Sequence, residues 1–414
     1  MTIRNFNLRL TQQHFTNLLT AGVLYALSVG CHVANADTDE FNKKMRLARN
    51  GNESAQFDVG MMYFNGVGVE RNYREALRWF RKPAEKGIIN AQIKLGMILD
   101  KGEGVPENNR EALQWYLAAA RRGNAEAQYY VGNMYDHGEG VREDNDLAID
   151  MYLLAAEQGQ VDAQTRLGFM FGYGEGVPED DERAFKWFYR AAQQGRTEAI
   201  IRLAFMYDYG EGVVEDKAAA ATWYEESAKT GHIDSQYRLA FMLATGLGTR
   251  EDDAEALKWY ETAAANGDAE TQYRLGTKLS DGITLPINNN RATHWFKKAA
   301  EKGHENAQHK LADAYRYELG IRQNNKMAID WYTKAASQGN VSSQQSLGEM
   351  YEQGTGAPQD TINSYVWYSM AKTQGLGNAN EALDRVKSTM SSDEIELAQT
   401  KALDCYEANF KQCL

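Results

Sequence analysis

The chain has 414 residues and a formal net charge of −12, with 36 glycines and only five prolines. An acidic surface argues against nucleic acid as a partner, because phosphate binding needs a basic footprint, and against adsorption to an anionic membrane. A single domain of this length would be large, whereas an array of repeats escapes the limit because each unit needs only its neighbours to bury a core.

Residues 1–36 have the features of a secretory signal peptide. Arg4 and Arg9 form a basic start, residues 21–29 are mainly apolar, and Ala34-Asn35-Ala36 is an A-x-A cleavage site. We predict cleavage after Ala36 and a periplasmic or secreted protein. The apolar run is shorter than the ~20 residues that span a bilayer, so no integral membrane span is expected after cleavage.

The sequence contains three cysteines. Cys31 lies within the signal segment, and lipidation there is the alternative to cleavage after Ala36. Cys405 and Cys413 both fall in the last ten residues. In an oxidising compartment such a close pair predicts a disulfide that pins the C-terminus, and a staple is favoured over a redox site because there is no C-x-x-C.

The central part of the chain repeats every 36 residues. All eight tryptophans keep this interval or twice it, and an aromatic residue follows each one: Trp79, Trp115, Trp187, Trp223, Trp259, Trp295, Trp331 and Trp367. Glycines keep the same interval from Gly51 to Gly375. A fixed period in this range is typical of a solenoid. We therefore divide the chain into the signal peptide, a lead-in over 37–50, nine repeats over 51–375, and capping helices with the cysteine pair over 376–414.

One unit, residues 160–195, shows how each repeat is expected to fold. Apolar residues at helical spacing predict a first helix over 163–171, and the glycine-rich segment 172–178 breaks it. Asp180 or Asp181 can cap a second helix, which Gly195 would end. The Trp-aromatic pair of this second helix is predicted to pack in the core between its own hairpin and the next repeat.

The repeated pattern resembles a known family. It reads A-x-x-x-L-G, then G-x-G-V, an acid, and A-x-x-W-[YF]-x-x-A-A-x-x-G, and it is similar to the Sel-one-like repeat, a relative of the tetratricopeptide repeat. The resemblance covers residues 51–375 and implies an all-α, right-handed solenoid of antiparallel helix pairs. It also implies a scaffold or inhibitor of other proteins, with the first helices lining a concave groove.

The sequence departs from the family pattern in two respects. The loop of the seventh repeat reads Gly282-Ile283-Thr284-Leu285-Pro286, and the eighth has Glu318 in place of the first loop glycine. We expect these loops to fit less well and the C-terminal third to curve differently or to be softer. Some cysteine-rich relatives are associated with β-lactams, but this chain has no cysteine in any repeat, so that property is not carried over.

The sequence offers little catalytic or metal-binding chemistry. The segment from His304 to His309 resembles H-E-x-x-H but is one residue too long, so the second ring would turn away from the first. There is no G-x-S-x-G, P-loop or dinucleotide motif. The recurring Gly-Glu-Gly-Val is interpreted as a turn, since its glutamate would repel phosphate. We predict no catalytic residue, no metal and no cofactor.

The most informative variation lies on the first helices. The residue before the recurring leucine is arginine in four successive repeats, with phenylalanine three residues later in three of them and tyrosine four residues after that in two. These positions share one helical face and form what we call the ladder: Arg166, Phe169, Tyr173, Arg202, Phe205, Tyr209, Arg238, Phe241 and Arg274. Arginine and aromatic residues are enriched at binding hot spots.

Two interpretations of the ladder remain open. The arginines could bind a partner, or they could form i,i+4 salt bridges with Asp162, Glu198, Asp234 and Glu270, each worth about 0.2–0.5 kcal/mol. The leading hypothesis is an exported module that binds a protein or peptide, one with an acidic or aromatic element, in its groove. The alternatives are an immunity protein that neutralises a toxin, a weak β-lactam or cell-wall hydrolase, and a purely structural spacer.

Overall fold

The computed structural model describes residues 37–375, 379–410 and 413. The predicted signal peptide, with its cleavage site at Ala36 and the alternative lipidation site at Cys31, lies outside the described residues. The described residues form helices, turns and loops and contain no strand, as expected for an all-α chain. The chain divides into two compact units, residues 1–199 and 200–414.

Each repeat begins with a first helix of 13 residues. These helices are α2 (Glu53–Asn65), α4 (Ile89–Lys101), α6 (Ala125–His137), α8 (Val161–Tyr173), α10 (Thr197–Tyr209), α12 (Ile233–Thr245), α14 (Ala269–Asp281), α16 (Glu305–Tyr317) and α18 (Val341–Gln353). The boundary between the two units falls within α10. Before α2, residues 37–49 are helical and pack against it through Met45 and Ala48.

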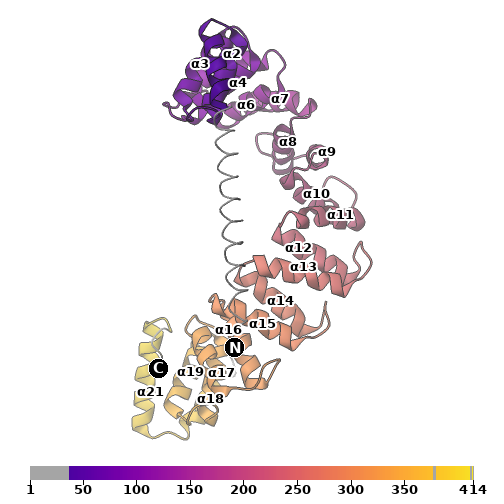
Figure 1. Ribbon diagram of the computed structural model, residues 1–414. Coiled ribbons are helices and arrows are strands. Elements are labelled where there is room, and N and C mark those ends of the chain that lie inside the picture. Colours follow the sequence, from indigo (N-terminus) through magenta and orange to yellow (C-terminus); the bar gives the residue numbers. More distant parts are fainter. Residues whose placement is uncertain (1–36, 376–378, 411–412, 414) are drawn as a thin grey trace, which may run out of the picture. The chain divides into compact units, whose positions relative to one another are not determined.

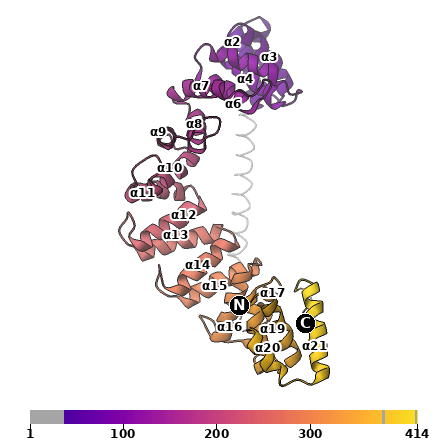
Figure 2. The same ribbon diagram turned by 180° about the vertical axis from the view of Figure 1, so that it is seen from behind.

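Each first helix is followed by a second helix that packs against it (Figures 1 and 2). The second helices are α3 (Tyr73–Glu85), α5 (Asn109–Ala120), α7 (Asn145–Glu157), α9 (Asp181–Gln193), α11 (Lys217–Lys229), α13 (Asp253–Asn266), α15 (Asn289–Glu301), α17 (Asn325–Ala336) and α19 (Thr361–Thr373). Within each unit, consecutive hairpins stack on one another, which gives the solenoid that the period predicts.

Short polar caps explain where the second helix of each repeat begins. An asparagine or aspartate precedes each one, and its side chain accepts a hydrogen bond from a free backbone N–H of the first turn. In the repeat analysed above the cap is Asp180 rather than Asp181. The hairpin loop of the eighth repeat keeps the usual geometry, because Glu318 adopts the left-handed conformation of the missing glycine at φ 60°. Our expectation that Glu318 disturbs this loop is therefore wrong, although a non-glycine residue there costs about 1 kcal/mol.

In five repeats the aromatic residue after the tryptophan, rather than the tryptophan, fills the core. Phe188 is buried against Gly168, where a Cβ atom would lie 2.6 Å from its ring. Trp187 is half-buried, as are Trp79, Trp115, Trp223 and Trp259, whereas the tryptophans of the last three repeats are buried. Adjacent helical residues point about 100° apart, so the tryptophans of the five repeats turn partly away from the core that the next residue fills, whereas Trp295 and Trp331 join the same core as Phe296 and Tyr332. The predicted packing of both aromatics in the core is thus correct for only one residue of the pair in these five repeats.

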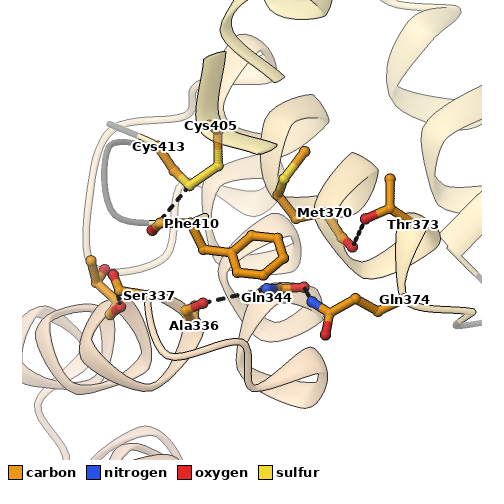
Figure 3. The surroundings of a disulfide bond; sticks show 10 residues. Ala336, Ser337, Gln344, Met370, Thr373, Gln374, Cys405, Phe410 and Cys413 are labelled. Carbon is orange, nitrogen blue, oxygen red and sulfur yellow. Dashed lines mark hydrogen bonds between the residues drawn. A yellow bond between two sulfur atoms is a disulfide. The ribbon is translucent and has the colours of Figure 1, made fainter. Parts of the chain in front are cut away.

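The C-terminal end of unit 2 is closed by α20 (Ala379–Lys387) and α21 (Ser392–Glu407), and α21 packs against α19. A capping box between Ser391 and Glu394 starts α21. A disulfide joins Cys405, near the end of α21, to Cys413, with Cα atoms 4.5 Å apart. Figure 3 shows Phe410 between this disulfide and Gln344, and both cysteines belong to the same core as α17 to α19.

Candidate functional site

The ladder arginine of unit 1 binds carboxylates in the hairpin before it and in its own loop. Arg166 donates from Nε to Oδ2 of Asp136 at 2.7 Å and from Nη2 to Oδ1 at 3.1 Å. Its Nη1 lies 2.6 Å from Glu175. Asp136 also accepts from the hydroxyl of Tyr152 at 3.0 Å. Burial alone would raise the pKa of Asp136, but the hydrogen bond from Arg166 and its charge outweigh burial and lower the pKa.

The ladder aromatics contact each other along their own helices. Phe169 stacks on Tyr173 with ring centroids 6.0 Å apart and meets the core ring of Phe188 edge-on at 5.0 Å. Phe205 and Tyr209 lie 4.3 Å apart on α10. The tyrosine residues at the edge are about half exposed, 54% for Tyr173 and 53% for Tyr209. Each helix therefore presents one tyrosine to solvent and keeps its phenylalanine partly buried.

In unit 2, Arg238 repeats the arrangement of Arg166. It donates to both oxygens of Asp208, at 2.7 and 2.8 Å, and Asp208 is fully buried. Asp208 also accepts from the hydroxyl of Tyr224 at 3.1 Å and from Nζ of Lys217 at 3.1 Å. Burial would raise the pKa of Asp208, but the hydrogen bonds from Arg238 and Lys217 lower it. Arg238 therefore ties α12 to α10 through a buried carboxylate.

The arginines do not find their acids where the salt-bridge interpretation placed them. Arg166 and Arg238 pair with an acid 30 residues earlier instead of one four residues earlier. Two of the proposed partners bind elsewhere: Asp162 binds Arg196, and Glu270 binds His304. The i,i+4 alternative is wrong for these two arginines, because their side chains reach across to the preceding repeat.

The last ladder arginine lies in a different setting. Arg274 is exposed and its guanidinium carbon lies 4.3 Å from the ring centroid of Tyr237. With Lys278 it lines a pocket of about 270 Å³ between α12 and α14, whose other walls are Asp234, Tyr237, Arg238 and Phe241. Among the described residues no carboxylate lies within 4.0 Å of the charged nitrogens of Arg274 or Lys278. Three cations, two aromatic rings and one acid therefore surround this pocket.

The histidines of the 304–309 segment make separate contacts. His304 caps α16 through Nδ1 and binds Glu270 through Nε2, whereas His309 contacts Ser343 and Asp313. Over the residues with a described structure, no three His, Cys, Asp or Glu side chains are placed to hold a metal ion. Every helix in the described ranges is too short or too polar to cross a membrane.

Comparison with known families identifies the repeats. The Sel1 repeat profile matches nine successive segments: residues 53–88, 89–124, 125–160, 161–195, 197–232, 233–268, 269–304, 306–340 and 341–376. The chain belongs to the Sel1 repeat family. This confirms the resemblance seen in the sequence. Sel1 repeat proteins are typically non-catalytic scaffolds that bind other proteins.

Two solved structures share the fold and much of the length. A Sel1 repeat protein from Oxalobacter formigenes is 31% identical, with 75% of this chain and 89% of that chain covered and a TM-score of 0.53. A protective antigen present in uropathogenic Escherichia coli strains, which displays an SLR fold, is 28% identical, with 89% and 87% covered and a TM-score of 0.57. A comparison with curated proteins gave no match.

The Sel1 repeat pattern also points to a candidate site residue that our sequence reasoning missed. Four residues after the ladder arginine position, other repeats carry an apolar residue, which is buried in all of them except the first: Met62, Ile98, Met134, Met170, Met206, Met242, Ala314 and Met350. In the seventh repeat this position is Lys278. Burial lowers the pKa of Lys278, because the charged ammonium is removed from water near Tyr237 and Phe241. A lysine at a repeat position that is otherwise mostly methionine was the signal that could have identified the pocket.

Proposed function

We propose that this Sel1 repeat protein is an exported module that binds a protein or peptide partner at the pocket between α12 and α14. The observation that carries the proposal is the cationic and aromatic lining of this pocket, Arg238, Arg274 and Lys278 with Tyr237 and Phe241, in a chain of net charge −12. A partner with an acidic or aromatic element fits such a lining, since guanidinium groups bind carboxylates and aromatic rings stack.

Export is part of the proposal. Residues 1–36 have the pattern of a cleaved signal peptide, and the disulfide between Cys405 and Cys413 fits an oxidising compartment. We place the mature protein in the periplasm or outside the cell, with cleavage after Ala36. It functions there without a cofactor or a resident metal.

The ladder contributes unequally to this function. Arg166 and Arg238 hold buried carboxylates, which supports a structural role for them. Arg274 is exposed beside the pocket, and Phe241 lines it. We therefore assign partner binding mainly to Arg274, Phe241 and Lys278. Tyr173 and Tyr209 are exposed side chains that extend the available surface in their own units.

A pull-down from cell-envelope extract tests the proposal. The protein is compared with a variant carrying Arg274→Ala and Lys278→Met; the second change restores the methionine of other repeats, so the variant is expected to fold, as circular dichroism will check. A matched control, Lys186→Ala with Arg190→Ala, removes the same charge from a pocket of about 420 Å³ beside Trp187 on α9.

A partner retained by the parent and the control but lost by the pocket variant would support binding at α12 and α14. Loss by the control alone would move the binding surface to α9. The identity of the captured partner also distinguishes the related hypotheses. If the partner is a toxin enzyme, the immunity-protein hypothesis is favoured. Hydrolysis of a β-lactam or cell-wall fragment that survives purification and is abolished by the pocket variant would favour an enzyme.

A further inference from the structure

The repeats contain an internal series of buried or half-buried carboxylates that tie neighbouring helices together. Each accepts a hydrogen bond from a tyrosine hydroxyl 16 residues later, and from an arginine 30 or 33 residues later. The three complete sets are Asp136 with Tyr152 and Arg166, Asp208 with Tyr224 and Arg238, and Glu352 with Tyr368 and Arg385. In each set the carboxylate satisfies a buried hydroxyl and a guanidinium at once, which stabilises the contact.

The contact between the sixth and seventh repeats keeps the tyrosine and the arginine of such a set but has lost the acid. Tyr260 and Arg274 occupy the places of Tyr224 and Arg238, whereas Ala244 occupies that of Asp208. Tyr260 is fully buried, and its hydroxyl has no hydrogen-bond partner among the described residues. A buried hydroxyl without a partner costs about 1–3 kcal/mol, so an acceptor is missing at this point of unit 2.

Other repeats that lack the acid do not show this defect. Gly172 and Ser280 stand at the same position, but their tyrosines are replaced by Phe188 and Phe296, which carry no hydroxyl. In the eighth repeat Arg316 stands there, and the hydroxyl of Tyr332 donates to Asp313 instead. Elsewhere, then, the acceptor and the donor are lost together or the donor is satisfied. At Ala244 the acceptor alone is lost.

The surroundings of Ala244 also carry positive charge instead of negative. Nζ of Lys278 lies 5.6 Å from the ring centroid of Tyr260 and 6.0 Å from that of Tyr237. Tyr237 lines the pocket and packs edge-on against Tyr260 behind it, with centroids 4.6 Å apart. The guanidinium carbon of Arg274, which lines the same pocket, lies 4.3 Å from the ring centroid of Tyr237. Two cations therefore meet in front of a buried hydroxyl that needs an acceptor.

We propose that this pocket is a seat for a carboxylate of the partner, a glutamate or aspartate side chain that binds between Arg274 and Lys278 and replaces the acid missing at Ala244. The inference rests on the proposed function and names the chemistry of its ligand. The partner's carboxylate takes the role that Asp208 plays one repeat earlier. No covalent step is involved, and binding is a set of charge-assisted hydrogen bonds.

Supplying the acid within the chain tests this directly. Ala244→Asp should raise the midpoint of thermal unfolding and occupy the seat. Ala244→Asn places a neutral side chain of the same size there and should reproduce neither effect fully. Ser280→Asp is the matched control, because it adds the same charge one repeat later, where Phe296 has no hydroxyl to donate, and it should not raise the midpoint.

Binding is measured by calorimetry with a capped peptide that has one glutamate between two phenylalanines, and with its glutamine counterpart. We expect the glutamate peptide to bind the parent at least about tenfold more tightly, since hydrogen bonds to charged groups are the stronger ones. Ala244→Asp should weaken the binding of the glutamate peptide about tenfold. Equal binding of the two peptides, no binding of either, or a glutamate affinity untouched by Ala244→Asp would overturn the proposal.

The two proposals fail in different ways. If Arg274→Ala with Lys278→Met releases the envelope partner while Ala244→Asp retains it, the pocket binds the partner but does not use the carboxylate seat. If the pocket variant retains the partner, the proposed function itself is wrong. Release by both variants, with retention by Ser280→Asp, supports both.

Discussion

Two successive contacts in unit 2 use the same arginine and tyrosine positions with opposite results. Between α10 and α12, Asp208 is buried and joins Arg238 to Tyr224. Between α12 and α14, the alanine at position 244 leaves the arginine exposed and the hydroxyl of Tyr260 without a partner. We call a carboxylate that joins a tyrosine hydroxyl to an arginine of the next repeat a carboxylate staple. Where the carboxylate is missing, the same positions form an open cationic pocket. An arginine repeated through a solenoid is not by itself a binding residue; the acid 30 residues earlier decides its role.

The largest expected effect on stability comes from removing the carboxylate staple at Asp208. Asp208→Ala leaves Arg238, Lys217 and Tyr224 without their shared acceptor, so we expect the free energy of unfolding to fall by about 2–3 kcal/mol. Thermal and urea unfolding followed by circular dichroism would measure the loss. Asp234→Ala, which removes an exposed acid one repeat later, is the control and should change stability by less than about 0.5 kcal/mol. A small effect of Asp208→Ala would mean that the staple adds little and that the comparison with position 244 has no energetic basis.

Much of the fold follows from the sequence, because each structural role repeats at a fixed position. The 36-residue period, the glycines that end the helices and the Asp or Asn caps all predict the hairpins. The geometry at Glu318 was not predictable from the glycine pattern alone, since the surrounding turn imposes a left-handed conformation that the residue does not favour. The half-buried tryptophans were missed because a period identifies equivalent positions without saying which way each one points.

The candidate site was predictable only in part. The ladder contained Arg238, Phe241 and Arg274, which do line or flank the pocket, but the sequence alone did not separate the structural arginines from the exposed one. That separation depends on contacts 30 residues apart, which are set by the stacking of one hairpin on the next. Lys278 stands where most other repeats have methionine, and this was visible in the sequence. Its role, however, could be inferred only from the structure, which places it near the ring of Tyr260.

A smaller effect, dependent on pH, distinguishes complete from incomplete staples. Asp100 binds the hydroxyl of Tyr116 at 3.4 Å, but Tyr130 stands where an arginine would follow. Burial and repulsion from Glu139 raise the pKa of Asp100, whereas the pKa of Asp208 is lowered. A carboxyl group whose pKa is lower in the folded protein stabilises the fold at pH values above its unfolded pKa near 3.9, and this stability is lost as the pH falls through the folded pKa. A carboxyl group whose pKa is higher in the folded protein destabilises the fold at neutral pH.

We therefore expect opposite signs for two matched substitutions. At pH 7, Asp100→Asn should raise stability and Asp208→Asn should lower it. The gain for Asp100→Asn should disappear by the unfolded pKa near 3.9, whereas the loss for Asp208→Asn should start to shrink there and vanish only at lower pH. Urea unfolding of the parent and both variants between pH 3 and 7 would measure this. Equal losses for the two variants at pH 7 would show that the arginine of the staple does not set the sign.

The smallest expected effect on stability concerns Arg274. Its side chain is exposed and meets no carboxylate within the described ranges, so Arg274→Ala should change the free energy of unfolding by less than about 0.5 kcal/mol, whereas Arg238→Ala, which strands the buried Asp208, should cost at least about 1–2 kcal/mol. Parallel urea unfolding of the two variants makes the comparison within one protein. The near-zero value for Arg274 is what allows a lost partner to be assigned to the pocket. A loss above about 1 kcal/mol would instead place Arg274 among the residues that hold α12 to α14, and the release of a partner by its variant would then reflect a disturbed fold.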